Sequence, residues 1–227
     1  MALAEVLRAQ GVEVVVVNSF VDAAGAVGYD PDTLLVLDDD WWVLTEETAA
    51  EVRGLARHVL VVQPSDDVLA GLAPDVQYAG FGGGIVDADC DLGAVERARS
   101  VDGVGDGYAA PASALRCLVD EQGHASLVRL EDADGTVTVL GVGEVLTHEL
   151  IAEQGNAALA LGLLGEHPRL VWYQPDIDDY ALDEQGLAAR QADWYVPLIV
   201  LFLLVGLAAA LWRGRRMGPV VVEDLPV

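Results

Sequence analysis

The chain of 227 residues is long enough for one full domain with accessory segments, and 53% of its residues are hydrophobic, which supplies a sizeable core. It has 37 acidic residues against 12 basic ones, all arginine, and a formal net charge of −25. A field of this sign repels nucleic acid and anionic lipid, because phosphate binding requires a basic surface. The composition therefore excludes nucleic acid as a partner. The acidity serves solubility or, alternatively, the binding of cations.

The sequence pattern of the first 62 residues predicts a sheet of buried strands. A helix is predicted over 3–10, closed by Gly11. Three short runs after it are apolar and rich in β-branched or aliphatic residues, as is typical of parallel strands buried on both faces: 12–17, 33–37 and 59–62.

Capping residues predict helices after the second and third of these strands. Thr45 can cap a helix that runs to about Arg57, with acidic residues in its first turn where the helix dipole favours them. Ser65 can cap a shorter helix towards Leu72. This alternation of buried strands and helices at short spacing predicts an α/β fold with an open parallel sheet.

The middle of the chain is less regular. Residues 78–111 are rich in glycine and weakly patterned, and we expect them to form an excursion from the sheet. Two β-rich runs then flank an Asp-Gly turn and predict a hairpin: 126–130, Asp134-Gly135 and 136–140.

The last part of the domain is predicted to contain one more helix and one more strand. The helix leads from Thr147 past Asn156 to Leu164, and residues 170–173 predict the strand. Asn156 is polar in an otherwise apolar helix, and we expect its side chain to bond loop backbone rather than to take part in chemistry.

The segment 194–212 is predicted to be a transmembrane helix. It carries no charge, and its length of about 19 residues nearly spans a hydrocarbon core of about 30 Å. Aromatic residues stand at both ends, as in the aromatic belts of membrane proteins: Trp194, Tyr195 and Trp212.

The arginines that follow this segment predict its orientation. Arg213, Arg215 and Arg216 favour a cytoplasmic tail at 213–227, so the α/β domain at 1–173 and the acidic linker at 174–193 should lie outside the cytoplasm. Export of the domain needs a signal or a first membrane helix, and the residues after Met1 do not have that pattern. We therefore expect the natural start to lie upstream, with the chain missing an N-terminal membrane helix.

Cys90 and Cys117 are predicted to form a disulfide. Outside the cytoplasm two cysteines usually pair, and closing a loop of this size stabilises the fold by roughly 3 to 4 kcal/mol in the chain-entropy model. The alternative is a nucleophilic thiolate. The acidic neighbours of Cys90 and the lack of a strand-to-helix turn at Cys117 disfavour it.

The best-placed ligand residues are Asp38, Asp39 and Asp40. They follow a predicted parallel strand, and open α/β sheets bind ligands at the carboxyl ends of their strands. His148 is the one histidine that merits a test as a further ligand-binding residue. The alternative is a solvated helix entry for the aspartates and a local backbone contact for His148.

No catalytic, cofactor or metal motif is complete in the sequence. Two glycine clusters, 82–84 and 141–143, lack the context that cradles phosphate, and no G-x-S-x-G elbow is present. Residues 131–135 fail the EF-hand pattern and are predicted to be a turn. The histidines have no metal-ligand spacing, so no catalytic residue, metal or cofactor is assigned.

Residues 139–176 read VLGVGEVLTHELIAEQGNAALALGLLGEHPRLVWYQPD, and residues 212–227 read WRGRRMGPVVVEDLPV. With AEVLRAQGVEVVVV near the start and the cysteine pair, they resemble the domain-of-unknown-function 4350 family of bacterial, largely actinobacterial, membrane proteins. The resemblance implies a flavodoxin-like fold, similar to class I glutamine amidotransferase domains but without the catalytic Cys-His-Glu set.

The resemblance also implies partners, and this chain departs from the family pattern at one motif. The family's genes often lie beside those for a MoxR-type ATPase and a von Willebrand-related protein, and its members usually have a first membrane helix before the domain. Where the family usually has Leu-Thr-Asn, this chain has Leu146-Thr147-His148, which puts a role of that asparagine in doubt.

These observations predict a non-catalytic, membrane-anchored, extracytoplasmic module that binds or assembles in an envelope complex with other membrane proteins. Two alternatives stay open. One is a degenerate amidotransferase-like or hydrolase-like enzyme that uses Ser65 or His148 with the aspartates at 38–40. The other is a cation-sensing or sugar-sensing domain.

Overall fold

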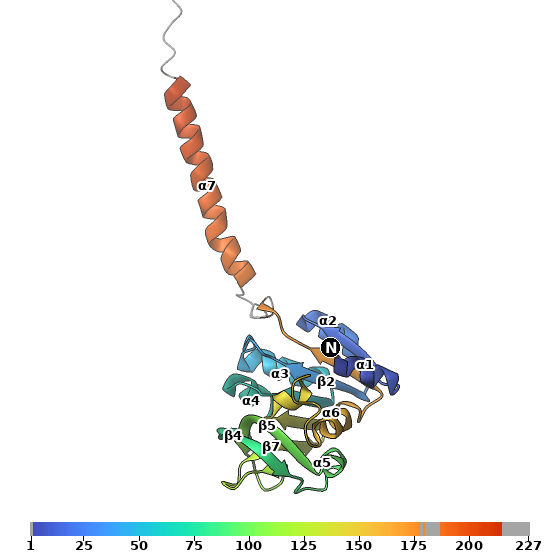
Figure 1. The fold of residues 1–227 in the computed structure, drawn as a ribbon. Coiled ribbons are helices and arrows are strands. Elements are labelled where there is room, and N and C mark those ends of the chain that lie inside the picture. The colour runs from blue at the N-terminus through green and yellow to red at the C-terminus, as the bar shows by residue number, and fades with distance from the viewer. Residues whose placement is uncertain (1, 178, 180–186, 215–227) are drawn as a thin grey trace, which may run out of the picture. The chain divides into compact units, whose positions relative to one another are not determined.

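The computed structural model describes residues 2–177, 179 and 187–214. The chain divides into two compact units, Met1–Tyr180 and Ala181–Val227, and each is treated by itself. The first unit is an α/β domain built on one large sheet (Figure 1). This confirms the predicted α/β class with an open sheet.

Five parallel strands form the centre of this sheet. Their order is β1 (Glu13–Val17), β9 (Arg169–Tyr173), β2 (Thr33–Asp38), β3 (His58–Val62) and β8 (Gly135–Leu140). All were predicted, but β9, the last in sequence, lies between the first two. The carboxyl ends of β2, β3 and β9 therefore meet at one edge of the sheet.

The sheet continues with antiparallel strands, so it is mixed rather than wholly parallel. The strands are β7 (Ala125–Asp132), which pairs with β8, then β5 (Ser100–Ala109) and β4 (Gln77–Asp87), while β6 (Leu115–Val119) pairs with β7 off this path.

The predicted excursion at 78–111 is therefore wrong, because most of this segment forms β4 and β5. Glycine weakens strand propensity and leaves no alternating pattern to read, yet it allows backbones to approach closely. A side chain at Gly105 would overlap the carbonyl of Gly141, so close packing explains the glycine there.

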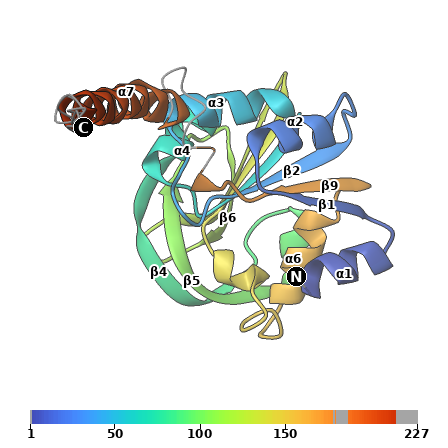
Figure 2. The ribbon, with the colours of Figure 1, turned by 90° about the horizontal axis from the view of Figure 1, so that it is seen from above.

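Helices cover both faces of the central strands (Figure 2). One face carries α1 (Ala2–Ala9), α5 (Gly93–Ala98) and α6 (Asn156–Leu164), and the other carries α2 (Phe20–Val27), α3 (Glu46–Leu55) and α4 (Asp66–Leu72). Each layer buries its own apolar cluster against the sheet. Strands β9, β2, β3 and β8 are thus apolar and buried on both sides. The expectation that residues 12–17 are buried on both faces is wrong, because β1 lies at the edge of the sheet and only Val14 of this strand is buried.

The predicted caps are confirmed. Thr45 forms a capping box with Thr48 at the start of α3, and the Ser65 hydroxyl accepts a hydrogen bond from Val68 N at the start of α4. Each such cap satisfies a backbone N–H that the helix leaves unpaired and contributes about 1 kcal/mol.

Helix α6 starts later than predicted. A 3₁₀ turn, η1 (Gly143–Leu146), follows β8, and turns lead from Thr147 to Asn156, where α6 begins. The buried Asn156 side chain accepts a hydrogen bond from Asp102 N (3.0 Å) and donates to Asp102 O (2.7 Å) and Leu150 O (2.8 Å). The structural role predicted for Asn156 is confirmed.

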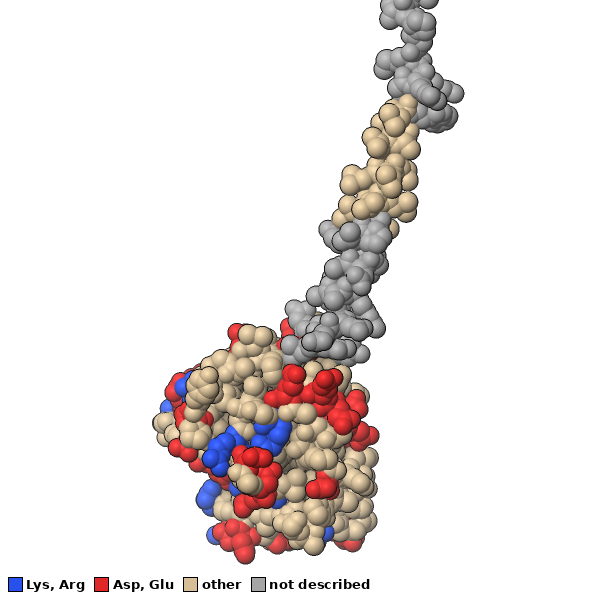
Figure 3. All heavy atoms as spheres, turned by 180° about the vertical axis from the view of Figure 1, so that it is seen from behind, with Lys and Arg blue, Asp and Glu red and all other residues tan. Residues whose placement is uncertain are grey.

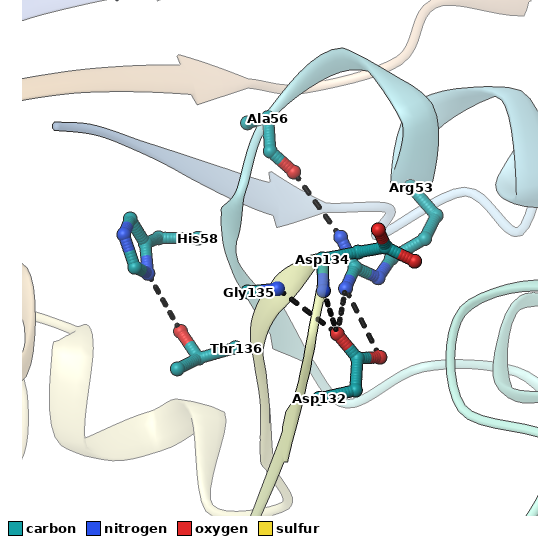
Figure 4. Close-up of polar contacts among 7 residues, drawn as sticks. All are labelled: Arg53, Ala56, His58, Asp132, Asp134, Gly135 and Thr136. Atoms are coloured by element: carbon teal, nitrogen blue, oxygen red, sulfur yellow. Dashed lines mark hydrogen bonds and ion pairs between the residues drawn. The ribbon is translucent and has the colours of Figure 1, made fainter. Parts of the chain in front are cut away.

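The turn between β7 and β8 is held to α3 (Figure 4). Asp132 Oδ1 accepts hydrogen bonds from Asp134 N (2.8 Å) and Gly135 N (2.9 Å), and its carboxylate also pairs with Arg53 at 3.2 Å. At the start of the neighbouring strands, His58 Nδ1 and Thr136 Oγ1 lie 2.9 Å apart. The predicted hairpin with its turn at Asp134-Gly135 is confirmed.

A disulfide joins Cys90 to Cys117, as predicted, with their Cα atoms 5.3 Å apart. Cys90 lies in the loop after β4, and Cys117 is fully buried on β6. The neighbouring Asp89 carboxylate accepts hydrogen bonds from Leu118 N (2.7 Å) and Val119 N (3.0 Å). The covalent bond and these contacts fix the loop to the antiparallel part of the sheet.

The second unit contains α7 (Leu187–Gly214). Its residues 198–211 are exposed and carry no charged side chain, so they appear in tan in Figure 3. Within the described part of the chain, no helix has the length and apolar character needed to cross a membrane. The side chains at 187–197 and at Trp212 lie outside the description, and the transmembrane segment at 194–212 stays a prediction.

The predicted linker at 174–193 falls into three parts. Residues 174–177 and 179 belong to the first unit, residues 187–193 lie in α7, and residues 178 and 180–186 are outside the described residues.

Replacing both cysteines with alanine should lower the free energy of unfolding by about 3 kcal/mol, because the unfolded chain regains the entropy of the open loop. Urea titration followed by circular dichroism measures this change. The unsubstituted protein treated with dithiothreitol is the matched control and should lose a similar amount. An unchanged free energy of unfolding in both samples would contradict a stabilising bond.

Candidate functional site

A cavity of about 360 Å³ opens at the carboxyl edge of the parallel strands. This volume lies within the range of small-molecule sites. Its apolar wall is formed by Leu3, Val62, Leu146, Ile151 and Trp172, together with Gly143. Its polar side chains come from the segments that follow β2, β3 and β8: Asp38, Asp40, Gln63, Glu144, Thr147 and His148.

The three consecutive aspartates have different surroundings. Asp38, at the end of β2, lines the cavity, and its Oδ2 accepts hydrogen bonds from Trp172 Nε1 and Gln174 Nε2, each at 3.1 Å. Asp40 lines the cavity as well. The Asp39 carboxylate is buried and accepts hydrogen bonds from Val43 N and Leu44 N, each at 3.0 Å. Asp39 therefore holds the loop, and only Asp38 and Asp40 are available to a ligand.

Asp38 and Asp40 form an acid pair. Burial raises the pKa of Asp40, and so do repulsion from Asp38, a hydrogen bond with Asp38 and repulsion from Asp39. Because burial and a nearby negative charge both disfavour its ionised form, Asp40 holds a proton more readily than an isolated aspartate does. It presents hydrogen-bond acceptors to the cavity and, when protonated, one donor as well.

Gln63 stands at a left-handed turn between β3 and α4. Its φ of 42° is uncommon for a residue other than glycine, and its backbone N–H donates to Leu140 O (2.8 Å). Its side chain lies against Gly143, where a Cβ atom would overlap the amide oxygen of Gln63. A strained turn from strand to helix is also the geometry of a nucleophile elbow.

The sequence has no G-x-S-x-G elbow, and the structure has a left-handed turn at Gln63 in the corresponding place after β3. Ser65, the candidate nucleophile of the enzyme alternative, instead caps α4 and does not line the cavity. The side chain of Gln63 is a primary amide, whereas a nucleophile elbow has a hydroxyl or thiol at this position.

His148 lies at the rim of the cavity. It is exposed and precedes α6 instead of starting it, which differs from its predicted place near a helix start. Among the described residues its side chain has no hydrogen bond that would fix the ring. The structure thus brings His148 together with Asp38 and Asp40 and leaves Asp39 out.

Sequence reasoning missed Gln63, Glu144 and Trp172. Glu144 follows Gly143 in η1, and its Oε2 accepts a hydrogen bond from Val104 N (3.3 Å). Gln63 and Glu144 each follow a strand of the parallel sheet directly or within a few residues. The rule that ligands gather at carboxyl ends would have found both, had it been applied beyond β2.

A second hollow, of about 230 Å³, lies on the other side of the acid pair. Asp38 and Asp40 line both spaces, so they form the wall between them. The remaining residues of this hollow come from the loop after β2 and from the segments after β1 and β9: Asn18, Trp41, Gln174, Pro175 and Asp176.

The side chains that line the cavity can form hydrogen bonds with a ligand. Cys90 and Cys117 are joined to each other, so neither offers a thiolate. Among the described residues, no three His, Cys, Asp or Glu side chains are arranged to hold a metal ion. The carboxylates of the cavity repel an anionic ligand. They can accept hydrogen bonds from the hydroxyl or amine groups of a neutral or cationic ligand.

The residues predicted to anchor the chain lie in or after α7. Arg213 is exposed near its end. The side chains of Trp194, Tyr195 and Trp212, and the residues Arg215 and Arg216, lie outside the described part of the chain.

Comparison with known proteins identifies the family. The model of the Domain of unknown function (DUF4350) family matches residues 1–164. An uncharacterized membrane protein of Mycobacterium tuberculosis is 34% identical over 231 aligned positions, which cover 100% of this chain. The chain spans 58% of the length of that relative. With this match over most of its α/β domain, the chain belongs to the DUF4350 family.

Proposed function

We propose that the chain is a non-catalytic, membrane-anchored module that binds a small ligand in the cavity at the carboxyl edge of its sheet. The observation that carries this proposal is Gln63 at the left-handed turn after β3. The turn resembles an elbow that presents a reactive group to a cavity, but the group presented here is an amide.

The lining of the cavity indicates the class of ligand. Asp38, Asp40 and Glu144 supply acceptors, and Gln63 supplies both an acceptor and donors. We infer a small neutral or cationic ligand, rich in hydroxyl or amine groups, that rests against the apolar wall. This is closest to the sugar-sensing alternative.

Four observations support the anchor and its orientation. The relative is named a membrane protein, and residues 198–211 of α7 are exposed, apolar and uncharged. Arginines after the helix favour a cytoplasmic tail. A disulfide is typical of domains that fold in an oxidising compartment, which is the outer side of the membrane.

A role in an envelope complex follows from the family resemblance. We propose that the module works with other membrane proteins and with a MoxR-type ATPase system. The enzyme alternative rests on Ser65 and His148. Ser65 serves as a helix cap, whereas His148 is free to turn towards a ligand.

The absence of a nucleophile predicts how the native protein reacts with covalent probes. A fluorophosphonate probe for serine and iodoacetamide for thiols should both leave it unlabelled. The variant Gln63→Cys should react with iodoacetamide, since the turn presents residue 63 to the cavity. Mass spectrometry of the intact protein measures both results. Fluorophosphonate labelling of the native protein that disappears in Ser65→Ala would overturn the non-catalytic assignment.

The raised pKa of Asp40 predicts that this cavity residue lowers the stability of the fold at neutral pH. The pKa of Asp40 is raised above its usual 3.8, so its ionisation in the folded state opposes folding. This penalty is fully present above the raised pKa and absent below pH 3.8. Asp40→Asn should therefore increase the free energy of unfolding at pH 7, and the gain should shrink as pH falls through the raised pKa.

Urea titrations at a series of pH values measure this effect. Asp134→Asn is the matched control, because it removes the same charge from an exposed turn away from the cavity. An equal effect of both substitutions would show that the whole acidic surface, and not the pair, is responsible.

A further inference from the structure

Two consecutive tryptophans, Trp41 and Trp42, lie exposed in the loop between β2 and α3. Their side chains are 82% and 73% exposed. An indole is among the largest apolar groups a fold can bury, and leaving two in water forgoes a stabilisation of roughly 2 kcal/mol each. Adjacent exposed indoles therefore indicate a contact made outside the domain.

The loop is built to hold them there. Trp42 has a left-handed backbone with a φ of 51°, and its N–H donates to Asp39 O (3.2 Å). The buried Asp39 carboxylate binds the next two backbone N–H groups, of Val43 and Leu44, whose side chains are buried. The backbone on both sides of the two tryptophans is thus fixed by hydrogen bonds. The fold therefore holds both indole side chains at the surface.

The chain leaves the domain beside this loop. Trp41 lines the same 230 Å³ hollow as Pro175 and Asp176. Just beyond, Ile177 is 68% exposed, and the buried carboxylate of Asp179 accepts hydrogen bonds from Phe20 N (3.0 Å) and Tyr173 Oη (2.9 Å). These hydrogen bonds hold the segment that follows β9 to the domain at Asp179.

A short connection then leads to the apolar helix. Residues 180–186 separate Asp179 from the start of α7, and a fully extended chain of this length reaches about 28 Å. If α7 is the membrane anchor, which rests on the proposed function above, the exit edge is tethered near the bilayer. Such a short connection keeps the domain close to the lipid surface. Even a weak contact between the domain and the bilayer is then favoured, because the effective concentration of lipid is high.

We propose that Trp41, Trp42 and Ile177 form a bilayer-contacting surface, with the indoles at the level of the lipid headgroups. Tryptophan favours this interface because its ring is apolar and its N–H still finds a hydrogen-bond partner there. The neighbouring carboxylates of Asp38, Asp40 and Asp176 repel anionic headgroups. The surface therefore fits a zwitterionic bilayer, such as one of phosphatidylcholine.

Depth measurement by electron paramagnetic resonance tests this surface. The full chain is reconstituted in phosphatidylcholine vesicles with a nitroxide on Trp42→Cys, which is the only free thiol because the native cysteines are bonded. Tyr29→Cys is the matched control. Tyr29 is a fully exposed aromatic residue, but it lies between α2 and β2, at the start of a strand instead of its end. A second probe site, Ile177→Cys, does not disturb the tryptophan loop.

At position 42 and at position 177, the ratio of oxygen accessibility to nickel-chelate accessibility should be at least about twofold higher than at position 29, because oxygen concentrates in lipid and the chelate in water. Vesicles that contain phosphatidylglycerol should reduce this difference. Equal ratios at all three positions would overturn the proposed surface and leave the edge free for a protein partner.

Flotation after a carbonate wash separates the two proposals. Protein that floats with the vesicles and still shows equal ratios retains its anchor but lacks the surface. Protein that is stripped from the vesicles contradicts the anchor itself and therefore overturns both.

Discussion

The structure depends on one constraint, which is that the parallel strands inside the sheet, β9, β2, β3 and β8, are covered by helices on both faces. Strands buried in this way have no place for polar side chains except at their ends. Asp38 is the last residue of β2, Gln63 follows β3, and Trp172 lies near the end of β9. The order of the strands brings these ends together, so the same burial that stabilises the domain also assembles its cavity.

The cavity contains features that oppose stability. Gln63 has a left-handed backbone, and burial together with repulsion from Asp38 raises the pKa of Asp40. Strain of this kind costs of order 1 kcal/mol or more and persists where the surrounding structure imposes it. The strained residue Gln63 lines the cavity at the carboxyl edge of the sheet.

Much of the fold could be predicted from the sequence, because the buried strands, the capping residues Thr45 and Ser65 and the Asp-Gly turn have local signals. The cysteine pair and the structural role of Asn156 could also be predicted. Strands β4 and β5 could not, since glycine hides strand periodicity. The insertion of β9 between β1 and β2 could not either, because it depends on long-range pairing. At the site, the aspartates were visible, but the conformation of Gln63 depends on contacts with Leu140 and Gly143 that no local pattern reveals.

The proposed role places the domain on the outer side of the membrane, and sidedness tests it most directly. A membrane-impermeant maleimide can be applied to intact bacteria that produce the full-length protein with a single added thiol. We predict that Tyr29→Cys, in the domain, is labelled in intact cells and that Val222→Cys, in the tail, is labelled only after lysis. Labelling of Val222→Cys in intact cells, with Tyr29→Cys protected until lysis, would place the domain in the cytoplasm and contradict an extracytoplasmic binding module.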